Sequence, residues 1–245
     1  MNFTAPAFVL LFPIVLALHW MLPPSRRWVL LLAASLGFYA VGSPQALPLL
    51  AGITLGTYAA ALGIAKSKTQ TAKKLWLTCA AVLCIGCLCL FKYAGIFRTD
   101  VPLLLPAGIS FYTFQTLSYV IDIYRGRLMP ERHPGYYALF VSFFPQLVQG
   151  PINRYGEIAP QLTARHIWNW ERTKRALFLF LFGAMKKYAI ANLTAPTIAA
   201  ILDGNDPKLA GSMALLAILL YSLQQYADFS GGIDMVLGVA QLYGI

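Results

Sequence analysis

The feature that most constrains this chain is a series of apolar stretches, several of them close to the roughly 20 residues that a helix needs to cross a bilayer. Of its 245 residues, 58% are hydrophobic and only 11% are charged. Helices satisfy their own backbone amides in hydrocarbon. We therefore predict an all-α fold, a polytopic transmembrane helical bundle that forms one membrane-embedded domain over residues 1–245. The stretches are 6–22, 28–42, 46–65, 75–92, 103–124, 136–151, 174–192, 209–227 and 233–245.

Loops that contain Lys or Arg alternate with loops that contain neither. Two arginines follow the first stretch, residues 43–47 carry no Lys or Arg, and four lysines lie in 66–74. The positive-inside tendency then places the N-terminus outside and the basic loops in the cytoplasm, with the chain in the cytoplasmic membrane. The basic loop 152–175 breaks this alternation. Because 136–151 is short and contains Pro145, we expect a broken, re-entrant segment there that enters and leaves from the cytoplasmic side.

Several kinds of chemistry find no support in the sequence. The net charge of +10 is spread over many loops instead of one aromatic-lined face, so we expect no nucleic acid partner. All four cysteines lie within 75–92 and are expected to be small buried side chains. The three histidines, His19, His133 and His166, stand in no metal-ligand or catalytic spacing. We expect no bound metal.

The stretch 103–124 carries a polar face at helical spacing, which is unusual inside a membrane. Gln115 on this face lines a passage or forms hydrogen bonds between helices. Asp122 stands near Arg125 and Arg127, and this spacing predicts a local ion pair. The residues that share the face are Gly108, Phe111, Tyr112, Gln115, Ser118, Tyr119 and Asp122.

Two glutamines lie in the segment interrupted by prolines. Gln146 and Gln149 are three residues apart, between Pro145 and Pro151. Their side chains either face a substrate passage or bind backbone groups that the prolines release.

Two carboxylates, Asp228 and Asp234, stand where the last two apolar stretches meet. Carboxylates at membrane depth indicate a functional role. Residues 221–228 place four polar side chains on one helical face, and residues 230–232, Ser-Gly-Gly, are predicted to interrupt the helix. Asp228 and Asp234 therefore either line a hydrated interior or cap the helix break.

Three blocks of sequence carry a resemblance to a known family. They are PAGISFYTFQTLSYVIDIYRG at 106–126, FFPQLVQGPINRYGEIAPQL at 143–162 and DFSGGIDMVLGVAQLYGI at 228–245. Together, and in this order, they resemble the membrane-bound O-acyltransferase family. The resemblance covers nearly the whole chain and is closest to the bacterial branch of alginate O-acetylation and teichoic acid D-alanylation proteins.

The resemblance implies transfer of an acyl group from a cytoplasmic thioester donor, such as acyl-coenzyme A or an acyl-carrier protein, to a hydroxyl of an extracytoplasmic polysaccharide or cell-wall polymer. It also implies an extracytoplasmic acyl-transfer partner and contact with membrane lipid. The family's catalytic His stands in a Trp-His-x-Ser-Leu type motif that follows the third block, and this chain ends before it. We therefore expect no catalytic residue in this chain and no activity from it alone. The polar-network candidates that remain are Gln115, Gln149, Asp228 and Asp234.

Two other classes of function fit parts of the sequence. A transporter or permease is supported by the broken helices and by Asp228 and Asp234. A non-catalytic membrane scaffold predicts that substitutions on the polar faces have no effect.

Overall fold

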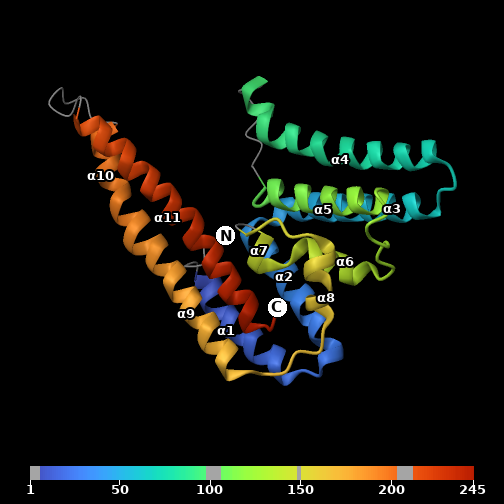
Figure 1. Ribbon diagram of the computed structural model, residues 1–245, viewed down its shortest axis with the longest axis horizontal. Coiled ribbons are helices and arrows are strands. Elements are labelled where there is room, and N and C mark those ends of the chain that lie inside the picture. The colour runs from blue at the N-terminus through green and yellow to red at the C-terminus, as the bar shows by residue number, and fades with distance from the viewer. Residues whose placement is uncertain (1–5, 98–105, 148–149, 203–211) are drawn as a thin grey trace. The chain divides into compact units, whose positions relative to one another are not determined.

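The computed structural model describes residues 6–97, 106–147, 150–202 and 212–245 (Figure 1). In these residues the chain is helical and forms no strand, which confirms the all-α prediction. It divides into two compact units, residues 1–168 with Ile245 and residues 169–244. The helices of the first unit are α1 Pro6–Met21, α2 Pro24–Gly42, α3 Leu47–Lys66, α4 Gln70–Phe97, α5 Ile109–Tyr124, α6 Pro134–Ser142, α7 Phe144–Leu147 and α8 Tyr155–Thr163, with a short 3₁₀ turn at Pro44–Ala46.

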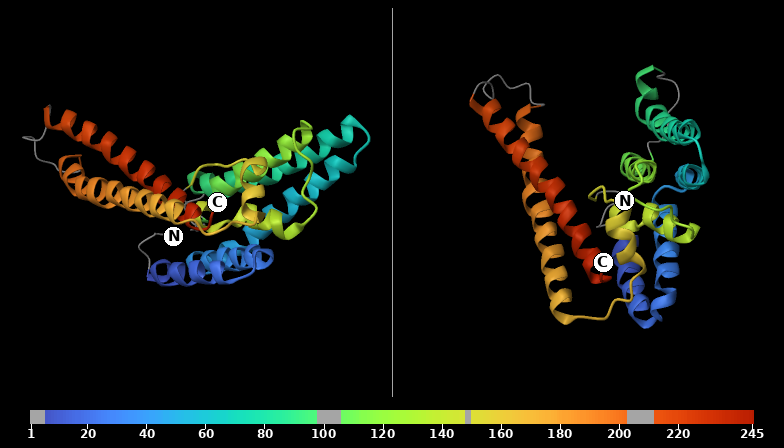
Figure 2. Two further views of the ribbon diagram at one scale, coloured as in Figure 1. Left: turned by 60° about the horizontal axis from the view of Figure 1, so that its bottom comes forward. Right: turned by 45° about the vertical axis from the view of Figure 1, so that its right-hand side comes forward.

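The second unit is a helical hairpin. Its first arm runs without interruption through α9 (Trp170–Ala184), a π-helical segment (Met185–Ala191) and α10 (Asn192–Leu202). Its second arm is α11 (Ser212–Leu242), which runs antiparallel beside the first arm in every view (Figures 1 and 2).

Three helical segments are long and apolar enough to cross a membrane. They are Pro44–Lys66, Gln70–Tyr93 and Trp170–Ile201 among the residues described. The chain is therefore a membrane protein, as its sequence predicts. The other expected stretches form helices that are shorter or more polar.

In the first unit, α3 packs against both α4 and α5, and α2 packs against α6. Tyr119, Tyr137 and Phe140 are almost completely buried in this core. The Tyr137 hydroxyl forms a hydrogen bond of 2.8 Å with the Thr57 hydroxyl of α3, so a polar group in the core is satisfied. The ring of Tyr119 on α5 lies 4.7 Å from that of Tyr137 on α6, so these two helices pack against each other.

The segment that contains Pro145 is broken, as expected. Helix α6 ends at Ser142, and α7 begins two residues later at Phe144. The backbone amide of Phe144 donates a hydrogen bond to the Ser35 hydroxyl of α2, at 3.1 Å. A side chain from a neighbouring helix thus satisfies an amide at the break.

The predicted helix interruption at residues 230–232 is wrong. Helix α11, Ser212–Leu242, continues through them, so the described parts of the last two apolar stretches lie in one helix instead of two. A Cβ atom at Gly231 would lie 2.6 Å from the carbonyl oxygen of Gly183 in α9, and one at Gly238 would lie 2.7 Å from that of Ala176. These glycines therefore allow two backbones to approach closely, which small residues do in membrane helix pairs. The low helix propensity of glycine predicted a break that does not occur, because packing against α9 stabilises the helix.

Candidate functional site

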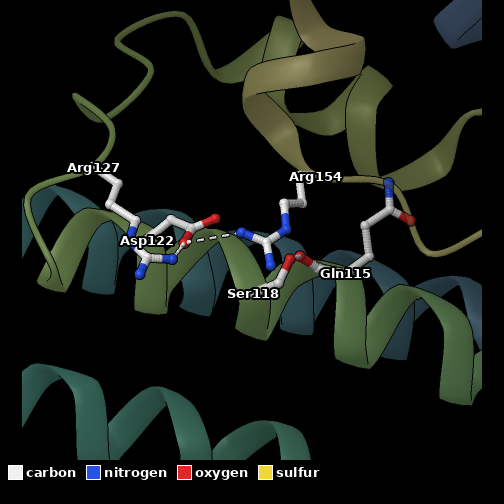
Figure 3. A network of polar contacts seen from close by, with 5 residues as sticks. All are labelled: Gln115, Ser118, Asp122, Arg127 and Arg154. Carbon is white, nitrogen blue, oxygen red and sulfur yellow. Dashed lines mark hydrogen bonds and ion pairs between the residues drawn. The ribbon is translucent and has the colours of Figure 1, made fainter.

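The polar face of α5 is turned into the protein. The Gln115 side chain lies on the same side of α5 as Asp122 (Figure 3). It is buried, with 5% of its surface exposed, and its Nε2 donates a hydrogen bond of 3.0 Å to the Phe140 carbonyl of α6. One turn further on, the Ser118 hydroxyl donates to the Gln115 carbonyl at 2.8 Å. In the described residues Gln115 therefore joins two helices, the second of the two roles that its position suggests.

At the C-terminal end of α5, Asp122 lies between two arginines. Its Oδ1 atom is 3.7 Å from Nη1 of Arg127 and 3.9 Å from Nη1 of Arg154 (Figure 3). The Asp122 side chain is 9% exposed, whereas the two arginine side chains are 55% and 60% exposed. The predicted local ion pair is thus formed with Arg127, and Arg154 adds a partner from a distant segment.

Arg127 reaches Asp122 because the helix ends in a left-handed glycine. Gly126 has φ = +71°, a conformation that costs glycine little. Its amide donates to the Ile123 carbonyl at 3.0 Å, and the Arg127 amide donates to the Asp122 carbonyl at 2.9 Å. This pair of bonds is the Schellman motif, which turns the chain back over the last helical turn.

Arg154 is positioned by the residue that follows it. The Tyr155 hydroxyl donates a hydrogen bond of 2.8 Å to Oε2 of Glu131, and its ring packs 4.7 Å from that of Tyr119 on α5. Burial raises the pKa of the Tyr155 hydroxyl, and its hydrogen bond to Glu131 raises that pKa further. Tyr155 therefore remains a neutral donor that holds the start of α8 against α5.

The second unit holds two ion pairs between its arms. Nζ of Lys186 lies 2.7 Å from Oδ2 of Asp234, and Nζ of Lys187 lies 2.5 Å from Oδ1 of Asp228. Both lysines belong to the π-helical segment, where the Asn192 amide donates to the Lys187 carbonyl. Such segments interrupt the ordinary helical register and recur at functional sites. Here neighbouring lysines both reach α11.

The structure brings together only some of the residues singled out from the sequence. Asp228 and Asp234 share one helix, three residues on either side of Gly231. Gln115 belongs to the other unit, and Gln149 lies outside the described residues. Because α11 continues, Asp228 and Asp234 do not cap a helix break. Their lysine partners were missed, although two adjacent lysines inside the apolar stretch 174–192 signal a need for opposite charge.

The described residues contain no group of His, Cys, Asp or Glu that could hold a metal ion. His133 accepts a hydrogen bond from the Tyr136 amide at 3.3 Å and thereby caps α6. The ring of His166 is bonded to the Gln161 carbonyl at 2.6 Å, and His19 packs edge-on against Trp20. Each of the three histidines therefore takes part in a local structural contact. Among the described residues, the polar groups of the site join helices and loops through hydrogen bonds and ion pairs, and none forms a nucleophile–base pair.

These features define a helical membrane protein whose interior carries hydrogen bonds and ion pairs. The chain is 35% identical, over its whole length, to a protein of Azotobacter vinelandii named probable alginate O-acetylase AlgI. It is 34% identical, over 90% of its length, to the peptidoglycan O-acetyltransferase of Helicobacter pylori. Over 56% of its length it is 30% identical to the teichoic acid D-alanyltransferase of Bacillus subtilis. The chain belongs to the membrane-bound O-acyltransferase family.

These alignments cover 52%, 48% and 35% of the three relatives. The chain thus spans about half the length of the first two curated relatives. No family model matches it.

Proposed function

We propose that this chain is part of an O-acyltransferase that transfers an acyl group to hydroxyls of an extracytoplasmic polysaccharide or cell-wall polymer. The observation that carries the proposal is the similarity over the whole chain, at 33–35% identity, to proteins named alginate O-acetylases. Relatives named for peptidoglycan and teichoic acid support the broader class of polymer acceptors.

In this proposal the chain lies in the cytoplasmic membrane with its N-terminus outside. The donor is an acyl thioester, either acyl-coenzyme A or an acyl-carrier protein, which approaches the basic cytoplasmic loops. Clustered positive charge raises the local concentration of an anionic donor. An extracytoplasmic partner protein completes transfer to the polymer, and lipid surrounds the helices.

Gln115, Gln149, Asp228 and Asp234 contribute to the polar interior of this enzyme, and none of them is assigned a catalytic role. The hydrogen bond of Gln115 to Phe140 and the ion pairs of Asp228 and Asp234 support a role in positioning helices within each unit. Deprotonation of the acceptor hydroxyl requires a base near neutral pKa, which in the family is a histidine of the Trp-His type motif.

The test is deletion of the reading frame that encodes the chain, followed by measurement of ester-linked acetate and D-alanine on the exported polymers. We expect one of these esters to be lost and to return on complementation. Unchanged ester content of all exported polymers would contradict the proposal.

The runner-up function, a transporter, predicts another result. Ion-coupled uptake into proteoliposomes, abolished by Asp228→Asn, would favour it. Asp228 forms an ion pair with Lys187 of the other arm, so this variant tests both a role in transport and a role in joining the two arms. A variant that keeps polymer esterification but loses uptake would establish transport as a separate activity.

A further inference from the structure

The end of α5 carries more positive charge than its carboxylate neutralises. Arg127 and Arg154 both approach the same oxygen of Asp122, at 3.7 and 3.9 Å. These separations exceed hydrogen-bond length, so the two guanidinium groups share one carboxylate through charge alone. Two cations and one anion leave a surplus of one positive charge.

In the part of the chain that the structure describes, the Glu131 carboxylate forms no ion pair with Arg127 or Arg154. Glu131 accepts hydrogen bonds from the Tyr155 hydroxyl and from the His133 amide, both at 2.8 Å. Its two oxygens are therefore engaged in holding the loop and α8. Glu157, which is exposed in the first turn of α8, forms no ion pair with a described residue.

The two guanidinium groups keep their donors available. Neither side chain donates a hydrogen bond to another residue that the structure describes, and both are more than half exposed. Each guanidinium presents five N–H groups in a planar fork that matches the oxygens of a phosphate. In Figure 3 the two forks lie on either side of the Asp122 carboxylate.

The backbone brings both side chains to the same end of α5 before any ligand arrives. The left-handed Gly126 directs Arg127 back over the helix end, and the buried Tyr155 holds the adjacent Arg154 against α5. Asp122 attracts both side chains without using their hydrogen-bond donors. Preorganisation of this kind lowers the entropy that binding costs.

We propose that Arg127 and Arg154 form a binding site for a phosphate group. Binding of a phosphate group requires no acyl transfer, so the site can be tested apart from the proposed function, although the proposed donor acyl-coenzyme A is itself a molecule with a diphosphate group. The phosphate belongs either to a soluble molecule with a phosphate or diphosphate group or to the headgroup of an anionic lipid. Both sources offer the same chemistry, which is several oxygens that accept paired N–H donors.

The experiment measures the binding of two probes to the chain in nanodiscs of phosphatidylcholine. Inorganic pyrophosphate, titrated calorimetrically, represents the soluble source. Phosphatidylglycerol, mixed into the nanodiscs and counted by native mass spectrometry after release, represents the lipid source. We expect the double variant Arg127→Gln with Arg154→Gln to lower the affinity for one probe by about ten-fold or more, a change of about 1.4 kcal/mol.

Arg125→Gln is the matched control because Arg125 is exposed at the same helix end and forms no ion pair among the described residues. It removes one positive charge, where the double glutamine variant removes two, and should change either affinity by less than about two-fold. The pair Arg127→Lys with Arg154→Lys keeps the charge and loses the fork, so it should also weaken binding while preserving the fold.

Loss of pyrophosphate binding assigns the soluble source, and loss of phosphatidylglycerol alone assigns the lipid source. Equal effects of Arg125→Gln and of the double glutamine variant would overturn the proposal. So would failure of the wild-type chain to bind either probe. Ester content of the polymers is not a readout here, so this result is separate from that of the acyltransferase proposal.

Discussion

Lys186 and Asp234 join the two arms of the second unit through an ion pair of 2.7 Å across 48 residues of sequence. Their side chains are only 17% and 20% exposed, and Lys186 lies within a candidate membrane span. A lone charge at the centre of a membrane helix costs about 2.5–3.5 kcal/mol on insertion scales. The pair therefore couples the register of the hairpin to its stability in the bilayer.

Removing one partner of this pair should destabilise the hairpin. Asp234→Asn leaves the Lys186 charge uncompensated, and we expect a loss of about 3 kcal/mol in unfolding free energy, measured in mixed micelles. The exchange Lys186→Asp with Asp234→Lys should recover more than half of that loss. Lys174→Met is the control, because the Lys174–Glu171 pair is exposed and should contribute less than about 1 kcal/mol. An equally large effect of the control would contradict this role.

The close contact of α9 and α11 depends on a missing side chain. A Cβ at position 231 meets the Gly183 carbonyl at 2.6 Å, and the neighbour is rigid backbone. Gly231→Ala should therefore separate the helices and lower stability by about 1–3 kcal/mol, measured by unfolding in micelles.

Gly52→Ala provides the comparison, since Gly52 lies in α3 and a Cβ there meets nothing within 4 Å. That substitution should stabilise the protein by up to about 1 kcal/mol through helix propensity. If both alanine variants behave alike, close packing at Gly231 is not the reason for its glycine.

Gln115 should contribute to the stability of the fold through its amide nitrogen. Gln115→Leu removes the hydrogen bond to the Phe140 carbonyl and leaves that carbonyl unpaired in the interior, which costs about 1–3 kcal/mol. Gln225→Leu, which removes an exposed hydrogen bond to Tyr221, should cost much less. Thermal unfolding of the two variants checks this order, and a reversed order would place Gln115 outside the structural network.

Tyr155 should make stability sensitive to alkaline pH. Because its folded-state pKa is raised above the ordinary value of about 10, the unfolded chain releases the proton first. Its contribution is constant at neutral pH and declines as the pH rises above about 10. The difference in unfolding free energy between wild type and Tyr155→Phe should shrink over pH 10 to 11. A difference that does not change with pH would mean that Tyr155 titrates normally in the folded protein.

The sequence predicted features that depend on neighbouring residues. Helical spacing identified the polar face of α5, the proximity of Arg125 and Arg127 to Asp122 predicted a local ion pair, and Pro145 indicated the broken segment. It did not predict partners that are distant in the chain. Arg154 meets Asp122, and the lysines meet Asp228 and Asp234, only after separate helices pack.

The error at residues 230–232 has the same physical origin. Glycine lowers helix propensity when a helix stands alone, and this local rule predicted a break. In the folded hairpin the missing side chain lets α9 approach. The contact stabilises the helix more than the glycine weakens it.

The π-helical segment makes the hairpin sensitive to chain length at one point. Its hydrogen bonds span one residue more than those of an α-helix, as in the bond from Asn192 to Lys187. Deleting one residue between Met185 and Ala191 would restore α-helical spacing and rotate the preceding and following helices relative to each other by about 100°. Lys187 and α10 could then no longer face α11 together, so a single-codon deletion would do more harm here than most substitutions.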